Sequence, residues 1–397
     1  MPLSGIETTI SKGGLGRSIS LRDSVLYLCT ANAVRGTFNL NQGYRITTLS
    51  GLDDLGITEA NNGKLYRQVK AFYEITGSGK SLTIIGVSAT AEHSDILSGT
   101  MDLTASPPHG ILKSELDKQG GRITLVGYHH KVSSEPLSEG FPGGIHDAAT
   151  ELNTLADAYR QNRTPFFALL GGDELVFSGL KDYSTSDLGN VSLLISSVDS
   201  NQTKEASVGF TAGYLAGLPV QRLLGRVKNG SLPVTNAYYT DGTNIEESAD
   251  RFLTTINNRY LFVRIHQGRS GYYFEQAPTL TSESSDFSSI AYNRTFNKAI
   301  RIAGETLTNE VGDEVTLDAD GTLGSINASY YTRILEDAIG INMVASGELS
   351  GVVASIDPEQ TPIRSGSKIF IVLRVQPVGY STFISLDIGF TANLITP

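Results

Sequence analysis

Short apolar segments alternate with amphipathic segments through the first half of this 397-residue chain. Short apolar runs bounded by turn signals are typical of buried strands, and apolar residues that recur every three or four positions are typical of helices. Strands that alternate with helices predict an α/β core. The expected strands are Ser24–Ala33, Ser81–Val87, Arg122–Tyr128, Phe166–Leu170 and Val191–Val198, and the expected helices are Leu65–Tyr73, Ile145–Gln161 and Ala206–Leu218.

Composition and charge exclude several classes of protein. The chain carries 31 Lys and Arg against 41 Asp and Glu, a formal charge of −10, and it has no basic tract interleaved with aromatic residues, which argues against nucleic-acid binding. A single cysteine, Cys29, cannot form an intramolecular disulfide and is expected to be a small buried apolar residue. Because no apolar run approaches the ~20 residues that span a bilayer, and the start of the chain lacks a signal-peptide pattern, we expect no membrane insertion.

A repeated GxxxG pattern lies within Val208–Val220, where Gly209, Gly213 and Gly217 recur every four residues. This pattern also occurs in membrane helices, but the segment is too short to span a bilayer. We expect these glycines to allow close packing of a helix on a sheet.

The segment Gly77–Ser81, with the sequence GSGKS, resembles the end of a phosphate-binding loop. The full motif needs a glycine six residues before the lysine, and that position is Glu74, an acid where phosphate would lie. The motif also follows a predicted helix and precedes a predicted strand, which is the reverse of the order a phosphate loop requires. We therefore expect a tight turn and no bound nucleotide.

Other motifs give no cofactor, metal or catalytic assignment. The segment Thr316–Gly321 resembles a calcium loop, but its first position is Thr316 and its twelfth is Asn327, where Asp and Glu are needed. The adjacent His129 and His130 follow a strand and should face opposite ways, which makes them a poor metal pair. No nucleophile motif such as GxSxG is present. The sequence therefore predicts a protein that is not an enzyme.

The segment Asp286–Leu307 is predicted to form one helix with two distinct faces. Arg294, Lys298 and Arg301 are spaced i, i+4, i+7 and form a basic stripe. A local basic stripe on an acidic protein suggests a docking surface for an acidic partner, and the alternative is a solvated helix face. The apolar stripe on another face comprises Ile290, Phe296, Ile300, Ala303 and Leu307.

The C-terminal part continues with an acidic turn at Glu310–Gly324 and a helix over about Asn327–Met343. Two strands, Lys368–Gln376 and Thr382–Phe390, are predicted beyond it. The sequence PVGYS joins them, so that the chain ends as a β-hairpin or an extended arm.

Several segments, in their order along the chain, resemble the contractile tail sheath proteins of bacteriophages and related contractile injection systems. Residues 100–235 match only in their α/β character. The segments that carry the resemblance are GGLGRSISLRDSVLYLCTANAV, LSGLDDLGITEANN, LYRQVKAFYEITGSGKSLTIIGVS, RYLFVRIHQGRSGYYFEQAPTLTSESSDFSSIAYNRTFNKAIRIAGETL, TLDADGTLGSINASYYTRILEDAIGINMVASGELSGVVASID and IVLRVQPVGYSTFISLDIGF.

The resemblance implies a multi-lobed α/β sheath-subunit fold with mixed sheets, flanking helices and extended terminal arms. The parts it implies are an N-terminal arm (1–20), a first part of the core (21–99), an outward-facing middle lobe (100–235), a tube-facing domain (236–376) and a C-terminal strand or arm (377–397).

By the same resemblance, the chain would polymerise as stacked hexameric rings around an inner tube and contract by subunit reorientation, driving the tube through a target envelope. Its partners would be other copies of itself, the inner tube protein, and the baseplate and terminator or cap proteins. Arg294, Lys298 and Arg301 would face an acidic tube. The particle would be a virion tail or an injection machine assembled in the bacterial cytoplasm. Two other classes stay open: a different phage tail or baseplate protein, and a soluble α/β nucleotide-binding enzyme that uses the GSGKS turn.

Overall fold

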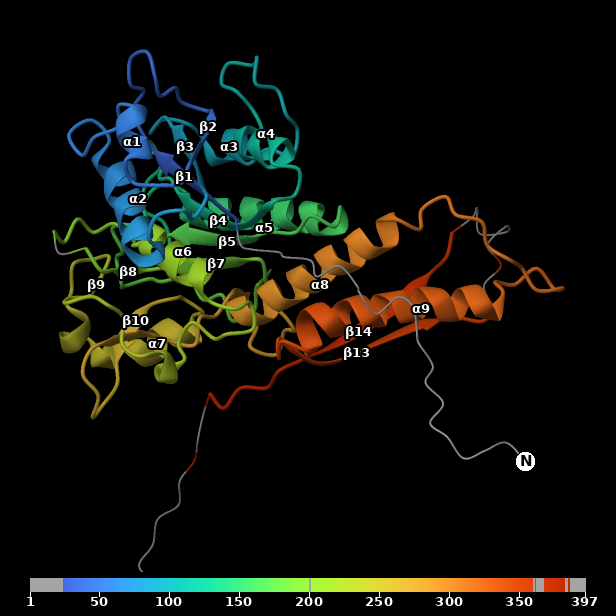
Figure 1. Cartoon of the computed structure of the whole chain (residues 1–397). Coiled ribbons are helices and arrows are strands. Elements are labelled where there is room, and N and C mark those ends of the chain that lie inside the picture. Colours follow the sequence, from blue (N-terminus) through green and yellow to red (C-terminus); the bar gives the residue numbers. More distant parts are fainter. Residues whose placement is uncertain (1–23, 200, 360, 362–367, 383–384, 386–397) are drawn as a thin grey trace, which may run out of the picture.

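One six-stranded sheet organises the larger part of the molecule (Figure 1). The computed structural model describes residues 24–199, 201–359, 361, 368–382 and 385. The strand order is β2-β3-β1-β4-β5-β7, in which β2 is an antiparallel edge strand and the others run parallel. This arrangement confirms the predicted α/β core. The strands are β1 (Ser24–Thr30), β2 (Gly43–Ile46), β3 (Leu82–Val87), β4 (Ile123–His129), β5 (Phe167–Gly171) and β7 (Val191–Leu194).

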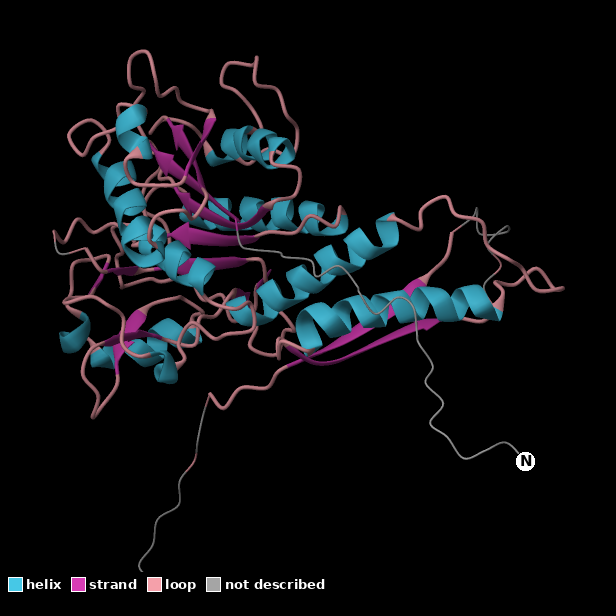
Figure 2. Ribbon diagram, viewed as in Figure 1, coloured by secondary structure: helices cyan, strands magenta, loops and turns pink. Residues whose placement is uncertain are grey.

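Helices cover both faces of this sheet (Figure 2), so its parallel strands are buried on both sides and read as continuous apolar runs. Helices α2 and α6 lie on one face, and α3, α4 and α5 lie on the other. None of the helices in the described residues combines the length and apolar character needed to cross a membrane. The helices of this part are α1 (Gly51–Asp54), α2 (Gly63–Thr76), α3 (His93–Ile96), α4 (Ile111–Lys118), α5 (Ile145–Gln161), α6 (Val208–Gly217) and α7 (Phe252–Asn257).

Gly209 and Gly213 of α6 face another helix, which corrects the expectation that the glycines pack on a sheet, whereas Gly217 faces open space. A Cβ atom added to Gly209 would lie 2.1 Å from the carbonyl oxygen of Gln68 on α2, and one added to Gly213 would lie 3.0 Å from that of Phe72. The sheet is contacted instead by Val208, whose side chain lies over Gly127 of β4. Gly209 and Gly213 therefore let the backbones of α2 and α6 approach closely.

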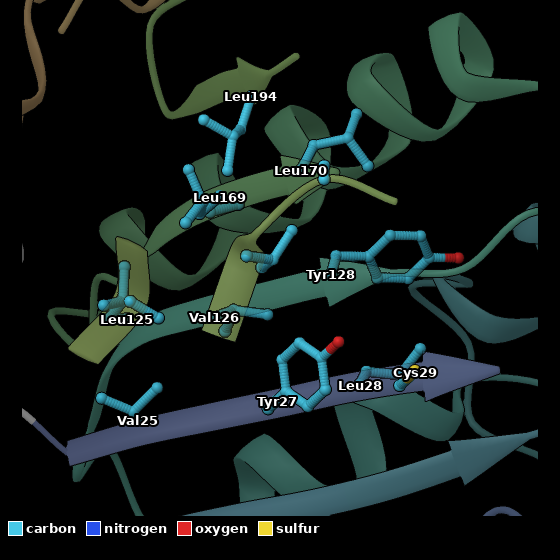
Figure 3. Packing of buried hydrophobic residues seen from close by; sticks show 14 of the residues in the cluster. Val25, Tyr27, Leu28, Cys29, Leu125, Val126, Tyr128, Leu169, Leu170 and Leu194 are labelled. Atoms are coloured by element: carbon cyan, nitrogen blue, oxygen red, sulfur yellow. The ribbon is translucent and has the colours of Figure 1, made fainter. Parts of the chain in front are cut away.

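The core between the strands is densely packed with large side chains (Figure 3). Tyr27 on β1 and Tyr128 on β4 are both almost completely buried. Cys29 is fully buried, as predicted, and burial raises the pKa of its thiol to about 12. A thiol in this state is an inert core residue.

The same hydrophobic core continues from Val25 to Ile290 and includes several short elements that cover the β7 edge. Because β1 pairs with β4, the predicted boundary between residues 21–99 and 100–235 falls within one sheet and does not separate two units. The outward orientation of residues 100–235 stays a prediction. The short elements are β6 (Asp187–Leu188), β8 (Ser196–Ser197), β9 (Tyr238–Tyr239), β10 (Val263–Ile265), β11 (Tyr272–Phe274), β12 (Leu280–Thr281), η1 (Val227–Asn229), η2 (Ile245–Glu247) and η3 (Ala249–Arg251).

The C-terminal segment projects from this α/β body as two long helices beside a two-stranded sheet (Figure 1). A separate small core holds it together and comprises Ala299, Ile302, Ile339, Met343 and Leu349. The elements are α8 (Ile290–Thr308), α9 (Ser325–Ile339), which continues as the π-helix η4 (Gly340–Val344), β13 (Leu349–Ile356) and β14 (Ile371–Pro377).

The first strand of the predicted C-terminal hairpin, Lys368–Gln376, is confirmed as β14, and the hairpin itself stays a prediction. Strand β14 pairs antiparallel with β13, a strand that the sequence did not predict, and most of the expected partner Thr382–Phe390 lies outside the described residues. The start of the predicted C-terminal arm also moves. The hydroxyl of Tyr380 donates to the carbonyl of Gln221 and its ring packs against Tyr292, so the chain is still attached to its own subunit at this point.

Candidate functional site

The carboxyl ends of the parallel strands are where an α/β fold would carry a ligand. Among the parallel strands, the order β3-β1-β4-β5-β7 changes direction between β1 and β4, and ligands of doubly wound folds bind outside the strand ends at such a point. Here a buried polar network lies at this place. The Tyr27 hydroxyl lies 2.8 Å from Nδ1 of His129, and Nε2 of His129 lies 2.7 Å from the carboxylate of Asp173.

Asp173 is the centre of the network. It also accepts a hydrogen bond of 2.6 Å from the Lys64 ammonium and one of 2.8 Å from the backbone N–H of Ala206. Burial acts to raise the pKa of Asp173, but His129 and Lys64 outweigh it and hold the pKa well below its usual range. Burial lowers the pKa of His129, which is therefore neutral near pH 7. These groups bond to one another within the chain, so the network ties β1, β4 and α2 to the segment that follows β5.

The neighbouring histidines face opposite sides, as predicted. His130 contacts the Thr30 hydroxyl and the Ala91 carbonyl, while His129 contacts Tyr27 and Asp173. Within the described residues, no three His, Cys, Asp or Glu side chains are grouped so as to hold a metal ion.

The GSGKS segment forms the turn between α2 and β3, as predicted from its order in the chain. Gly77 and Gly79 both have positive φ angles, of 69° and 97°, which favour glycine. The ammonium group of Lys80 donates to the carbonyl of Ala216 near the end of α6. The lysine therefore attaches the turn to a neighbouring helix end, where a cation is favourable.

Helix α8 carries the three basic residues that the sequence singled out, and all three contact other parts of the same chain. Arg294 is 5% exposed and donates to the carbonyls of Leu215 and Leu218 at the end of α6. The ammonium group of Lys298 lies 2.5 Å from the carboxylate of Glu348. These contacts fix α8 to the α/β body and to the start of β13.

Arg301 makes the most extensive contacts of the three. Its guanidinium donates to the backbone carbonyls of Gly121, Ile123 and Pro165, which surround the starts of β4 and β5. Each of the three cations therefore contacts another part of the same subunit and holds α8 in position. A role for them in facing an inner tube is not tested by these contacts and stays a prediction.

The limits and buried face of α8 differ from the prediction. The helix begins at Ile290 instead of Asp286, because the Ser289 hydroxyl accepts the N–H of Tyr292 and caps it. Phe296 of the predicted apolar stripe is 37% exposed, whereas Asn293 is fully buried and donates to the carbonyl of Gly189. The helix lies between the body and α9, so polar residues that find partners are buried along with apolar ones.

The β13–β14 sheet has one face exposed to solvent. Its two strands pair with each other, and within the described residues no third strand joins either edge. One face packs against α8 and α9. On the other face Val353 is 61% exposed and Val372 is 47% exposed. Exposed apolar strands with unpaired edges are templates for pairing with another chain, and a two-stranded sheet alone is marginally stable.

Comparison with solved structures identifies the class of this fold. The chain has the fold of contractile tail sheath proteins, with a TM-score of 0.64 to the helical sheath of the anti-feeding prophage in its contracted state, at 13% identity over 99% of this chain and 100% of that one. The contracted PVC sheath complex of an extracellular contractile injection system gives 0.60, at 14% identity over 99% of each chain. The sheath tail protein Lin1278 from Listeria innocua gives 0.51, at 9% identity over 92% of this chain and 97% of that one.

The chain belongs to the DUF2586 family: the family's N-terminal domain matches residues 3–277 and its C-terminal domain matches residues 286–394. The two matched ranges meet just before α8, where the α/β body ends and the C-terminal segment begins. No curated protein matches the sequence of this chain.

Proposed function

We propose that the chain is a structural subunit of a contractile tail sheath that polymerises around an inner tube. The observation that carries the proposal is the sheath fold over 99% of the chain, together with the open β13–β14 sheet. The proteins that share this fold form a helical sheath and a sheath complex, as their names state. The buried network around Asp173 supports a structural role, because its polar groups bond to one another within the chain.

In this proposal, terminal segments of neighbouring copies add strands to the β13–β14 sheet. Backbone hydrogen bonds supply the affinity of such strand addition, and alternate side chains supply specificity. The N-terminal segment 1–20 and the segment after Thr382 would be the added strands; residues 1–20 and most of the segment after Thr382 lie outside the described part of the chain. Contacts between different patches of identical subunits generate an open helical polymer of stacked hexameric rings.

Contraction would then be a rigid-body reorientation of subunits toward a shorter and wider packing. The partners would be the inner tube protein and the baseplate and terminator proteins, and the particle would be a virion tail or an injection machine. No chemical step on a nucleotide is required of this chain.

Electron microscopy of the purified protein tests the proposal directly. The full chain is expected to form hollow striated cylinders, and discrete globules under all assembly conditions would refute the sheath function. Deleting residues 1–20 or residues 386–397 is expected to leave monomers or short rings. The second deletion spares Tyr380, which attaches to its own subunit. Long sheaths that contract normally from both truncated chains would contradict strand addition by the termini.

A surface variant tests the β13–β14 sheet itself. The double substitution Val353→Lys and Val372→Lys places charges on the exposed face and should oppose pairing with another chain. Leu253→Lys is the matched control, since Leu253 is exposed on α7, away from this sheet. We expect the double variant to shorten the polymers and the control to leave them unchanged. Equal polymer lengths would exclude this face from assembly.

The predicted contact between α8 and the tube has a separate test. Exchanging the charges of Lys298 and Glu348 keeps their ion pair within the subunit but moves the positive charge off α8. If Lys298 contacts an acidic tube, the exchange should lower the yield of tube-filled extended sheaths. A normal yield would remove Lys298 from the tube contact.

A further inference from the structure

A groove of about 730 Å³ runs along the edge of the sheet where the parallel strands begin. This edge lies opposite the buried network around Asp173. The start of β1, the turn before β3, the turns before β4 and β5, and the last turns of α8 line the groove. Its lining includes five basic residues against one acidic residue, Glu305; the basic residues are Arg45, Lys80, Arg122, Arg163 and Arg301.

Three of these arginines are exposed and have no carboxylate partner. Arg45 donates to the hydroxyl of Ser81, a neutral group. Arg122 and Arg163 are exposed at the turns before β4 and β5. Among the described residues, none of the three takes part in an ion pair, whereas most charged residues near the opposite edge of the sheet are paired. Clustered like charges without partners repel one another, so an acidic occupant would relieve an unfavourable interaction.

The position of Arg163 is fixed by the fold. It adopts a left-handed backbone conformation with φ of 63°, which is uncommon for a residue with a side chain. Its stem lies against Gly304 of α8, where an added Cβ would be 3.2 Å from the Cβ of Arg163. The glycine lets α8 pass close to the turn, and the guanidinium is left at the surface of the groove.

The same chain carries a complementary acidic surface. The connection between α8 and α9 contains the carboxylates Glu310, Asp313, Glu314, Asp318 and Asp320 and no Lys or Arg between residues 310 and 320. None of these carboxylates forms an ion pair within the described residues. We call residues 310–324 the acidic turn.

An internal hydrogen bond and a bond to α9 hold the acidic turn in place. The Asp318 N–H donates to the carbonyl of Thr322, and the hydroxyl of Thr316 donates to Asn327 on α9. Figure 1 shows this connection at the far end of the C-terminal segment, away from the α/β body. Its exposed carboxylates therefore point to a partner outside the subunit.

We propose that the basic groove binds the acidic turn of a second copy of this chain. Charge complementarity identifies the occupant: within the described residues, neither the three exposed arginines of the groove nor the carboxylates of the acidic turn form an ion pair. A contact between two different patches of identical subunits is heterologous and continues from copy to copy. The proposal rests on the proposed sheath function, because it requires that the chain assembles with itself.

Charge reversal with mixing tests the proposal. The groove variant carries Arg45→Glu, Arg122→Glu and Arg163→Glu. The turn variant carries Asp313→Lys, Glu314→Lys and Asp318→Lys, and it spares Asp320, whose carboxylate holds Thr322 within the turn. A control variant with Arg35→Glu, Lys228→Glu and Arg269→Glu changes the net charge as much as the groove variant does, at exposed sites outside the groove.

Each reversed chain alone would place like charges in contact. Exposed ion pairs are individually weak, so reversing three charges is expected to raise the concentration needed for polymerisation about 10- to 100-fold at low salt. The control variant should polymerise like the original chain. High salt should bring the concentrations that the reversed variants and the control need for polymerisation closer together, because salt screens exposed charges.

The mixture distinguishes a contact between copies of this chain from a contact with a different acidic protein. In an equimolar mixture of the groove and turn variants, every groove again meets a turn of opposite charge, so polymers should form at the original concentration. The proposal is overturned if the groove variant alone polymerises like the control, or if the mixture polymerises no better than either variant alone. The second result would point to an acidic partner other than this chain.

A cross-link separates this proposal from the proposed sheath function. Chains with Arg122→Cys and chains with Glu314→Cys are mixed under mild oxidation, and the native Cys29 is buried and should not react. A disulfide between the two kinds of chain is expected, even if only short oligomers form. Sheath-like polymers without this disulfide would refute the groove contact alone, whereas the disulfide without any polymer would refute the sheath function alone.

Discussion

The contact between α2 and α6 predicts that Gly209→Ala destabilises the protein strongly. The new Cβ would lie 2.1 Å from the carbonyl oxygen of Gln68 and 2.7 Å from its carbonyl carbon, where ordinary contacts begin near 3.4 Å. These atoms belong to the backbone of α2, so α6 must move away by about 1 Å. Such overpacking typically costs about 1–3 kcal/mol.

The movement also disturbs a buried hydrogen bond of 2.7 Å from the Gly209 N–H to the side chain of Gln68, worth about 0.5–1.5 kcal/mol. Because alanine favours the helix more than glycine does, the substitution itself raises the free energy of unfolding by up to about 1 kcal/mol, which offsets part of this loss. We therefore expect the free energy of unfolding to fall by about 2–3 kcal/mol.

The same helix supplies a matched control. An added Cβ at Gly217 meets no atom within 4 Å, so Gly217→Ala should keep or raise stability by up to about 1 kcal/mol. Urea denaturation of both variants, at a protein concentration too low for polymerisation, measures the difference. If the two variants differ by less than about 0.5 kcal/mol, the close approach of α2 and α6 at Gly209 is refuted.

Three further measurements test buried and capping groups. Burial lowers the pKa of His130 to about 3, so the unfolded chain takes up this proton first as the pH falls below the usual histidine pKa of about 6.5. This group alone should lower the free energy of unfolding by about 1.4 kcal/mol per pH unit, and other buried histidines, such as His129, whose pKa burial also lowers, add to the fall; a flat profile between about pH 6 and 5 would contradict this. Asp173→Asn leaves the Lys64 ammonium buried without its carboxylate, so the free energy of unfolding measured in urea should fall by about 3–5 kcal/mol. The control Glu174→Gln breaks an exposed ion pair and should lower the free energy of unfolding by only about 0–1 kcal/mol. Ser289→Ala removes the cap of α8, so the free energy of unfolding should fall by about 1 kcal/mol and the helical circular dichroism signal should decrease. An unchanged free energy of unfolding would show that the cap does not stabilise the helix.

The central elements could be predicted because their patterns have a single physical cause. Helix α5 has the predicted limits, since one apolar face packs on the sheet and the opposite face meets water. The parallel strands stand out because burial on both faces makes them continuously apolar. Helix α8 could not be predicted as well, because it is enclosed on several sides and its buried residues include Asn293, Arg294 and Asn297. Strand β13 escaped prediction because glycine and serine, which are depleted in strands, interrupt its apolar residues.

The site could be predicted only in part, because its contacts join residues far apart in the chain. Nothing near Asp173 in sequence indicates that Lys64 and His129 surround it. The basic groove was equally hidden, since Arg45 lies on β2 whereas Arg122 and Arg163 lie in two separate turns, and only the strand order brings them to one edge. The spacing of Arg294, Lys298 and Arg301 was visible, but the spacing alone does not show whether a cation faces water or the carbonyl groups of its own chain.

The positions of those three cations bear on how a sheath subunit of this kind would move. Arg294 binds the end of α6, Lys298 binds Glu348 before β13, and Arg301 binds carbonyls beside β4 and β5. Arg294 and Arg301 thereby attach the C-terminal segment to the α/β body at two separate points, and these bonds would have to break together for the segment to rotate relative to the body. Contraction of the proposed sheath is therefore expected to change the contacts between subunits and to leave each subunit rigid. The contacts that would change are those of the added terminal strands and salt-sensitive ones, such as the groove with the acidic turn. Exposed ion pairs are individually weak, so such contacts can exchange as subunits reorient while the subunit itself stays intact.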